Sequence, residues 1–196
     1  MGCYLGFPIS ERGMFMQQLS KFPKIIKTPR LVLRVVEPTK ENAEKIFSIV
    51  EQNRDYLMDW QGHFGELKTA DNVKAYLTKR ANQIKTDSGV CFYIFYNDNI
   101  VGRVRFFDIR DNVCEIGYWL IKSANGNGFM SEALHALEVE LFKFGFKKIT
   151  LDIDDGNVHS ENVAKRNGYK FEKRLPMASW AKCVGKCDSL IYVKER

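Results

Sequence analysis

Long hydrophobic runs are missing from this sequence. None of its apolar stretches approaches the roughly 18 residues that a membrane-spanning helix needs. The first residues also lack the basic and then apolar layout of a signal peptide, and Gly6 stands where a myristoylation signal starting at Gly2 would need serine or threonine. We therefore expect a cytoplasmic protein that does not use the membrane.

Side chains that bind metals or form disulfides are few. The chain has three histidines and five cysteines, an odd number that is spread out with no close framework, which is typical of a reducing compartment. Cys183 and Cys187 are close in sequence, but no second pair and no clustered histidine completes a zinc set. The sequence therefore predicts no bound metal.

The bulk composition is that of a globular protein. Of the 196 residues, 45% are hydrophobic and 28% are charged, which suits one domain with a full core. We expect a single domain over residues 28–196, preceded by an extension of uncertain structure over residues 1–27. The net charge of +6 raises the question of nucleic-acid binding, but the basic residues are dispersed and no nucleic-acid module is visible. The alternatives to nucleic-acid binding are a solvated basic surface and a surface that steers acidic partners or CoA phosphates toward the protein.

A strand, a glycine loop and a long helix are predicted between residues 114 and 141. Residues 114–121 are apolar with aromatics, as in a strand, and the glycines of Asn125-Gly126-Asn127-Gly128 form a permissive turn. From Phe129 onward apolar residues recur at helical spacing: Met130, Ala133, Leu134, Leu137 and Leu141. A helix that starts directly from a glycine loop presents unpaired N–H groups and the positive end of its dipole, a geometry that binds phosphate.

The glycine pattern alone leaves the phosphate ligand open. A P-loop requires Lys-Ser or Lys-Thr after the glycines, and neither follows here. The dinucleotide pattern GxGxxG matches at Gly126 and Gly128 but has Ser131 in the third place, and Asp152 falls roughly where a ribose-binding acid would lie. A strand-to-helix turn that simply needed glycine accounts for the loop equally well.

The rest of the chain is predicted to contain helices and mostly antiparallel strands. The expected strands are at 30–37, 90–96, 100–108, 148–154, 171–175 and 190–193. The expected helices run from the cap Thr39 to about Asn53, from the cap Thr69, and over 160–167. Loops are expected at 56–68, where aromatics form either a satellite cluster or a pocket wall, and at 176–188. Three antiparallel strands before the glycine loop argue against a doubly wound fold.

Three separated blocks carry a resemblance to a known family. They are EIGYWLIKSANGNGFMSEAL, DDGNVHSENVAKRNGYKFEKRL and TPRLVLRVVEPTKENAEKIFSIVEQNRDYLMDW. They resemble the acetyl-CoA loop, the Asn-x-x-Ser turn with its short helix, and the first strand and helix of the GNAT acetyltransferases, in particular the RimJ/RimL-type N-acetyltransferases. Gly126 and Gly128 match the loop pattern, whereas Ser123 stands where arginine or glutamine is usual. The blocks cover about residues 28–175.

The resemblance implies an α+β fold of α/β/α layers. A mixed, mostly antiparallel sheet would be splayed open between the strands at 114–121 and 148–154, with acetyl-CoA in the gap. Open backbone groups of Leu120 and Ile121 would pair with the pantetheine arm, and Lys122 is a candidate for the charge that Ser123 lacks. Asn157 would bind the same arm, although it is also a good turn residue. The implied cofactor-binding residues are Leu120, Ile121, Lys122, Asn125, Gly126, Asn127, Gly128, Phe129, Met130 and Asn157.

Amine attack on a thioester needs a neutral amine and control of charge at the oxyanion and the leaving thiolate. The resemblance assigns the general acid to Ser160, whose alternative role is to cap the helix that follows. It assigns the base to Glu115, whose alternative role is that of a solvent-facing carboxylate. His159 is a second candidate base, and His135 is expected on the helix surface. The candidates for binding the substrate are Trp60 and Tyr118.

The predicted activity is transfer of acetyl from acetyl-CoA to a primary amine, without a metal. The favoured acceptor is the N-terminal α-amine of a protein or peptide, as in ribosomal-protein acetylation, because an α-amine is far more often neutral at pH 7 than a lysine. The alternatives are a small amine such as an antibiotic or polyamine, and a GNAT-like domain that binds CoA or RNA without catalysis. Nucleic acid and membrane are not expected partners, and a homodimer is compatible with the sequence.

Overall fold

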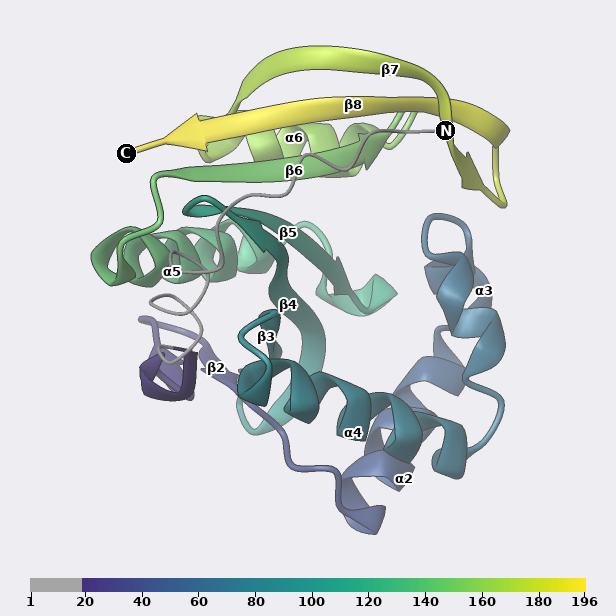
Figure 1. The fold of residues 1–196 in the computed structure, drawn as a ribbon. Coiled ribbons are helices and arrows are strands. Elements are labelled where there is room, and N and C mark those ends of the chain that lie inside the picture. Colours follow the sequence, from purple (N-terminus) through teal and green to yellow (C-terminus); the bar gives the residue numbers. More distant parts are fainter. Residues whose placement is uncertain (1–18) are drawn as a thin grey trace, which may run out of the picture.

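One eight-stranded mixed sheet runs through the computed structural model of this protein, which describes residues 19–196 (Figure 1). Its strand order is β1-β2-β3-β4-β5-β6-β8-β7, and every neighbouring pair is antiparallel except β5 and β6. The strands are β1 (Ile25–Lys27), β2 (Val32–Arg34), β3 (Gly89–Tyr96), β4 (Asn99–Arg110), β5 (Val113–Leu120), β6 (Lys148–Asp154), β7 (Lys170–Ala181) and β8 (Gly185–Glu195). The expected α+β fold with a mostly antiparallel sheet is confirmed.

Helices cover both faces of the sheet (Figure 1). One face packs against α5 (Phe129–Phe144) and α6 (Val158–Arg166), with Leu134 and Leu137 in its core. The other packs against α2 (Lys40–Gln52), α3 (Arg54–Met58) and α4 (Ala70–Lys85). Short 3-10 turns are η1 (Leu19–Lys21), η2 (Gly62–Glu66) and η3 (Lys122–Ala124). Because strand side chains alternate, β5 contributes Ile116 to the first core and Trp119 to the second.

Local signals placed several helix ends correctly. The hydroxyls of Thr39 and Thr69 accept hydrogen bonds from the backbone N–H groups of Asn42 and Asn72, each at 3.2 Å, so both predicted caps are confirmed. Gly145 ends α5 in the left-handed conformation, as predicted. These interactions involve residues close in sequence, which is why the pattern alone revealed them.

The sheet is splayed where β5 and β6 meet. The two strands pair only over Val113–Glu115 and Lys148–Thr150, and β5 continues to Leu120 beyond the last pair. Past this point the facing edges of the two strands no longer pair with each other. This confirms the expected gap and gives the sheet an internal edge.

Two segments expected to be loops have regular structure. Residues 56–68 contain most of α3 and the turn η2, so the predicted aromatic loop is wrong. Residues 176–188 belong to a long β7–β8 hairpin, and the strands predicted at 171–175 and 190–193 are too short. Strand β7 is exposed along nearly all its length and its register shifts between Leu175 and Ser179, so it has no apolar alternation to detect.

The N-terminal end of the described chain packs onto the sheet. Leu19 and Phe22 are buried in the core beside α5. The expectations about residues 1–18, including those on Gly2 and Gly6, lie outside the described residues. In the part of the chain that the structure describes, no helix is long and apolar enough to cross a membrane. The same residues contain no group of three or more histidines, cysteines or acids arranged to hold a metal.

Candidate active site

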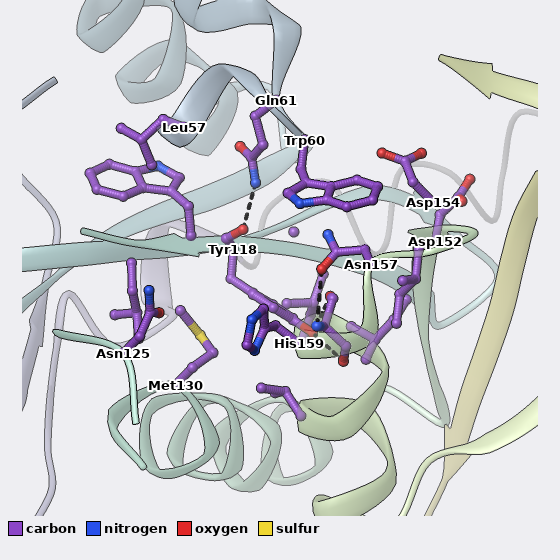
Figure 2. Close-up of a pocket in the computed structure, with 18 of the residues that line it drawn as sticks. Leu57, Trp60, Gln61, Tyr118, Asn125, Met130, Asp152, Asp154, Asn157 and His159 are labelled. Atoms are coloured by element: carbon purple, nitrogen blue, oxygen red, sulfur yellow. Dashed lines mark hydrogen bonds between the residues drawn. The ribbon is translucent and has the colours of Figure 1, made fainter. Parts of the chain in front are cut away.

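A cavity of about 200 Å³ opens where β5 and β6 part (Figure 2). Trp60 and Gln61 close it on the side of α3, and Met130 of α5 lies on the opposite side (Figure 2). The cavity brings together many of the predicted site residues: Trp60, Tyr118, Leu120, Asn125, Met130, Asn157, His159 and Ser160. These residues come from β5, α5, α6 and the loops next to helices and strands, and they meet at the opening of the sheet.

Two hydroxyl groups meet on the cavity wall. The Tyr118 hydroxyl of β5 lies 2.8 Å from Oγ of Ser160 in α6, and either can be the donor. Burial raises the pKa of Tyr118 to about 12, although the hydrogen bond with Ser160 acts to lower it. The phenol is therefore protonated at neutral pH. The pair is a short proton-donating chain that faces the cavity, and it joins residues 42 positions apart in the sequence.

The hydroxyl of Ser160 is not a helix cap. Helix α6 begins at Val158, and its cap is Asn157, whose Oδ1 accepts a hydrogen bond from the Ser160 backbone N–H at 3.1 Å. The alternative role of Ser160 as a cap is therefore wrong, because the helix starts two residues earlier than predicted. A carboxamide that caps with its oxygen keeps two N–H donors, so Asn157 retains groups that can bind a ligand.

The backbone at the end of β5 is only partly open. The N–H of Ile121 donates to the carbonyl of Val101 at 2.9 Å, and the carbonyl of Ile121 accepts from the N–H of Ala124 at 3.1 Å. The prediction that the backbone of Ile121 is open is therefore wrong. Because hydrogen bonds alternate along an antiparallel strand, the N–H and C=O of Leu120 point away from β4 and toward the cavity. Leu120 is thus the position at which an added strand could pair.

Gln61 is a cavity residue that the sequence did not indicate. Its Nε2 donates to the Tyr118 carbonyl at 2.6 Å, across 57 positions of sequence. The contact ties the segment after α3 to the open edge of β5 (Figure 2). No local pattern could have revealed this contact, because a single glutamine belongs to no sequence motif and its partner is distant in the sequence.

The glycine loop leads into α5 as predicted. Gly126 and Gly128 have φ angles of 79° and 74°, in the left-handed region that favours glycine. Gly128 is the cap position of α5, and within the described chain no side chain caps it. Side chains of the described residues therefore leave the first N–H groups of the helix uncapped, as in an anion site at a helix start.

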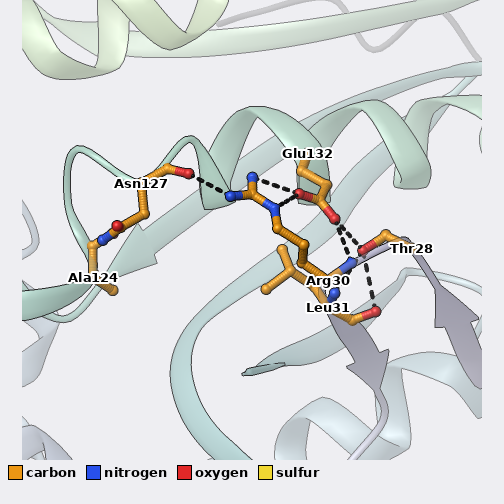
Figure 3. A network of polar contacts seen from close by, with 6 residues as sticks. All are labelled: Thr28, Arg30, Leu31, Ala124, Asn127 and Glu132. Carbon is orange, nitrogen blue, oxygen red and sulfur yellow. Dashed lines mark hydrogen bonds and ion pairs between the residues drawn. The ribbon is translucent and has the colours of Figure 1, made fainter. Parts of the chain in front are cut away.

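Arg30 supplies a positive charge at this loop that the sequence did not assign (Figure 3). Its guanidinium donates to the Asn127 carbonyl at 3.0 Å and to Glu132 at 2.6 Å, and it lies 4.9 Å from the centre of the Phe129 ring. Although partial burial opposes the change, hydrogen bonds from Thr28 and Arg30 lower the pKa of Glu132. A cation from the N-terminal segment is thus held against the loop that has Ser123 in place of arginine.

Glu115 lies at the closed end of the opening rather than on the cavity wall. It is the last residue of β5 paired with β6, opposite Thr150, and two positions before Gly117, which lines the cavity. Burial, followed by the charges of Asp152 and Asp108, raises the pKa of Glu115 to about 7. Asp152 lies further along β6 and does line the cavity.

The two histidines near the site differ in position. His159 lines the cavity beside Ser160, as its candidacy for the base requires. His135 has a largely exposed side chain on α5 at 4.0 Å from Glu138, which confirms the expected surface position.

Comparisons with known proteins agree with this geometry. A model of the acetyltransferase (GNAT) domain matches residues 30–170. A ribosomal-protein-serine acetyltransferase of Escherichia coli (strain K12) is 35% identical over 92 residues, which are 45% of this chain and 51% of that protein. The alignment thus spans about half the length of that relative.

Two solved structures share the fold. The ribosomal L7/L12 alpha-N-protein acetyltransferase RimL, in complex with coenzyme A, superposes with a TM-score of 0.82 and 21% identity, over 87% of this chain and 97% of that one. The microcin C7 self immunity acetyltransferase MccE, in complex with acetyl-CoA and AMP, has a TM-score of 0.80 and 22% identity, over 86% and 94% of the two chains. The overall fold of this chain is therefore shared with these two proteins.

Proposed function

This chain belongs to the GNAT acetyltransferase family, and we propose that it transfers the acetyl group of acetyl-CoA to the N-terminal α-amine of a protein or peptide in the cytoplasm. The observation that carries the proposal is the pair of hydroxyls, Tyr118 and Ser160, on the wall of the cavity between β5 and β6. The E. coli relative, named for acetylating a ribosomal protein, supports an acceptor of this class.

The donor site is proposed to use mainly backbone groups. The uncapped N–H groups at the start of α5 would bind the pyrophosphate, and Gly126 and Gly128 keep side chains away from it. The open backbone of Leu120 and the carboxamide of Asn157 would bind the pantetheine arm. Arg30 fixes the loop and adds a positive charge close to it.

The residues on the cavity wall, together with Glu115 at the closed end of the opening, suit the chemistry of acyl transfer. When an amine attacks the thioester, the departing sulfur takes a proton, and we assign its donation to Ser160, with Tyr118 as the group that can reprotonate it. Glu115, whose pKa is about 7, is the proposed acceptor of the amine proton, and His159 is the second candidate. A base with a pKa near the working pH is the most effective.

We expect a free α-amine to be preferred over a lysine side chain. An α-amine with a pKa near ~7.8 is about one-tenth neutral at pH 7, whereas a lysine near ~10.4 is neutral about 0.04% of the time, a difference of roughly 3.5 kcal/mol. An acidic peptide with a small, free N-terminal residue should therefore exceed spermidine and an N-blocked lysine peptide in kcat/KM by at least about tenfold. Mass spectrometry of the products would decide, and an acetyl group found mainly on lysine or polyamine would contradict the proposal.

We expect the activity to follow the ionisation of Glu115. Because its pKa is about 7, the carboxylate form that accepts a proton increases as pH rises from 6 to 8, and kcat/KM should rise with it. Glu115→Gln should remove this part of the pH profile. The acceptor amine titrates near ~7.8 with both proteins, so the difference between the two profiles isolates Glu115. Identical profiles would exclude Glu115 as the base and favour His159.

The same pKa has the opposite effect on stability. The folded protein keeps the Glu115 proton up to about pH 7, whereas the unfolded chain releases it near the ordinary value of 4.5. The free energy of unfolding therefore falls as pH rises from 4.5 to 7, and Glu115→Gln should flatten this decline in urea titrations. This second measurement tests the environment of the carboxyl independently of turnover.

A further inference from the structure

Three arginines lie together beneath α4 on the sheet face that carries Trp119. Arg103 and Arg105 come from β4, and Arg80 comes from α4. Within residues 19–196, none of the three forms an ion pair with a carboxylate; Arg103 donates to the hydroxyl of Tyr76, and Arg80 donates to Gln83 at 2.9 Å. The cluster is therefore rich in positive charge and poor in hydrogen-bond acceptors.

Each of these arginines has a donor that the described chain leaves without a partner. The Nε atoms of Arg80, Arg103 and Arg105 are buried and make no hydrogen bond among the described residues. Arg103 is only 3% exposed. Buried charged donors are nearly always paired in proteins, so such a concentration indicates an anionic acceptor supplied from outside.

Aromatic rings hold the guanidinium groups in place. Arg105 lies 3.8 Å from the centre of the Phe107 ring, and Arg80 lies 4.6 Å from that of Tyr76. The positive charges of the three arginines also affect the nearby His63. Burial, followed by the charges of Arg103, Arg105 and Arg80, lowers the pKa of His63 to about 3, so this histidine is neutral and does not add to the charge.

The cluster adjoins the cavity. In the sheet, Arg105 is paired with Gly117 and Arg103 with Trp119, and both partners line the cavity. A Cβ placed on Gly117 would lie 3.9 Å from Nε of Arg105. The ring of Phe107, on which Arg105 stacks, is nearer to that point, at 3.4 Å, so both side chains lie against β5 beside the cavity.

We propose that Arg80, Arg103 and Arg105 bind a carboxylate of the acceptor polypeptide, a few residues from the amine that is acetylated. The assignment rests on the proposed function and adds to it a specificity for aspartate or glutamate near the N-terminus. It differs from attraction by the net charge of +6, because it depends on particular guanidinium groups rather than on their sum.

The test compares peptides that differ in one carboxylate. An extended residue spans about 3.3 Å, so glutamate and its neutral isostere glutamine are placed in turn at positions 2, 3 and 4 of a peptide with a free N-terminus. We expect kcat/KM for the glutamate peptide to exceed that for the glutamine peptide by about tenfold at one position, as for one charge-assisted hydrogen bond. In Arg105→Gln, and separately in Arg80→Gln, this ratio should fall toward one.

The matched control is Lys79→Gln, which removes one positive charge from the exposed side of the same helix as Arg80. It should keep the ratio of the wild type. A wild-type ratio near one, or a ratio that all three variants reduce equally, would overturn the assignment. Sulfate that stabilises the wild type but not Arg105→Gln, in the absence of any glutamate preference, would show a site for a free anion and would also overturn it. If no peptide were acetylated while a small amine was, the proposed function itself would fail, and the assignment with it.

Discussion

Ser160→Ala is expected to lower kcat by about 10²- to 10⁴-fold, the usual contribution of a general acid. The Ser160 hydroxyl faces the cavity and lies 2.8 Å from the Tyr118 hydroxyl. Acetyl-CoA affinity should change little, because the donor is held mainly by the glycine loop. The melting temperature should also be nearly unchanged, since Asn157 and not Ser160 caps α6.

Two further single variants and one double variant complete this experiment. Tyr118→Phe keeps the ring and removes the hydroxyl, so it tests whether the chain of two hydroxyls acts as a unit. If it does, the double variant should lose little more than either single one. Thr39→Ala is the stability control: it removes a true helix cap on α2, costs about 1 kcal/mol and should leave kcat unchanged. A Ser160→Ala enzyme with wild-type kcat would exclude Ser160 as the acid, and a far larger loss in Tyr118→Phe would transfer that role to the tyrosine.

Gly126→Val is expected to weaken acetyl-CoA binding by at least about a hundredfold, since two charge-assisted hydrogen bonds to the pyrophosphate would be lost. Within the described chain, a Cβ at Gly126 would meet nothing within 4 Å, so the side chain would occupy the space left for the ligand. Its φ of 79° adds backbone strain of about 1–2 kcal/mol, which should appear as lost stability.

The control for backbone strain is Gly145→Val, at the C-terminal end of α5, the helix that follows the glycine loop. Gly145 also has a positive φ, of 114°, and a Cβ at this position would meet no atom of residues 19–196 within 4 Å. Both variants should lose stability, but only Gly126→Val should lose affinity in isothermal titration calorimetry on folded protein. Wild-type affinity in Gly126→Val would rule out the loop as the pyrophosphate site.

The structure also bears on the replacement of arginine or glutamine by Ser123. Lys122 is exposed beside the loop, whereas Arg30 is tied to it through Asn127 and Glu132. The positive charge at the loop therefore comes from a segment nearly a hundred residues earlier. This arrangement keeps a cation near the start of α5, where the donor is proposed to bind.

The sequence by itself determined the elements whose signals are local. The glycines at 126 and 128 predicted the loop before α5, Thr39 and Thr69 predicted two helix caps, and Gly145 predicted a helix end. In each case the two partners of the stabilising interaction lie within a few residues of each other, or a backbone angle requires glycine. A short segment of the sequence is therefore enough to predict the structure at that point.

Only the tertiary structure decided how distant residues combine. The hydroxyls of Tyr118 and Ser160 meet at the opening between β5 and β6, and Arg105 lies next to Gly117 of the cavity wall because the register of β4 and β5 pairs these two residues. The open backbone expected at Ile121 is paired with Val101, and the long β7–β8 hairpin has no apolar alternation because β7 is exposed. Strand register and the splay of the sheet depend on packing across the whole domain, and no local pattern of residues encodes them.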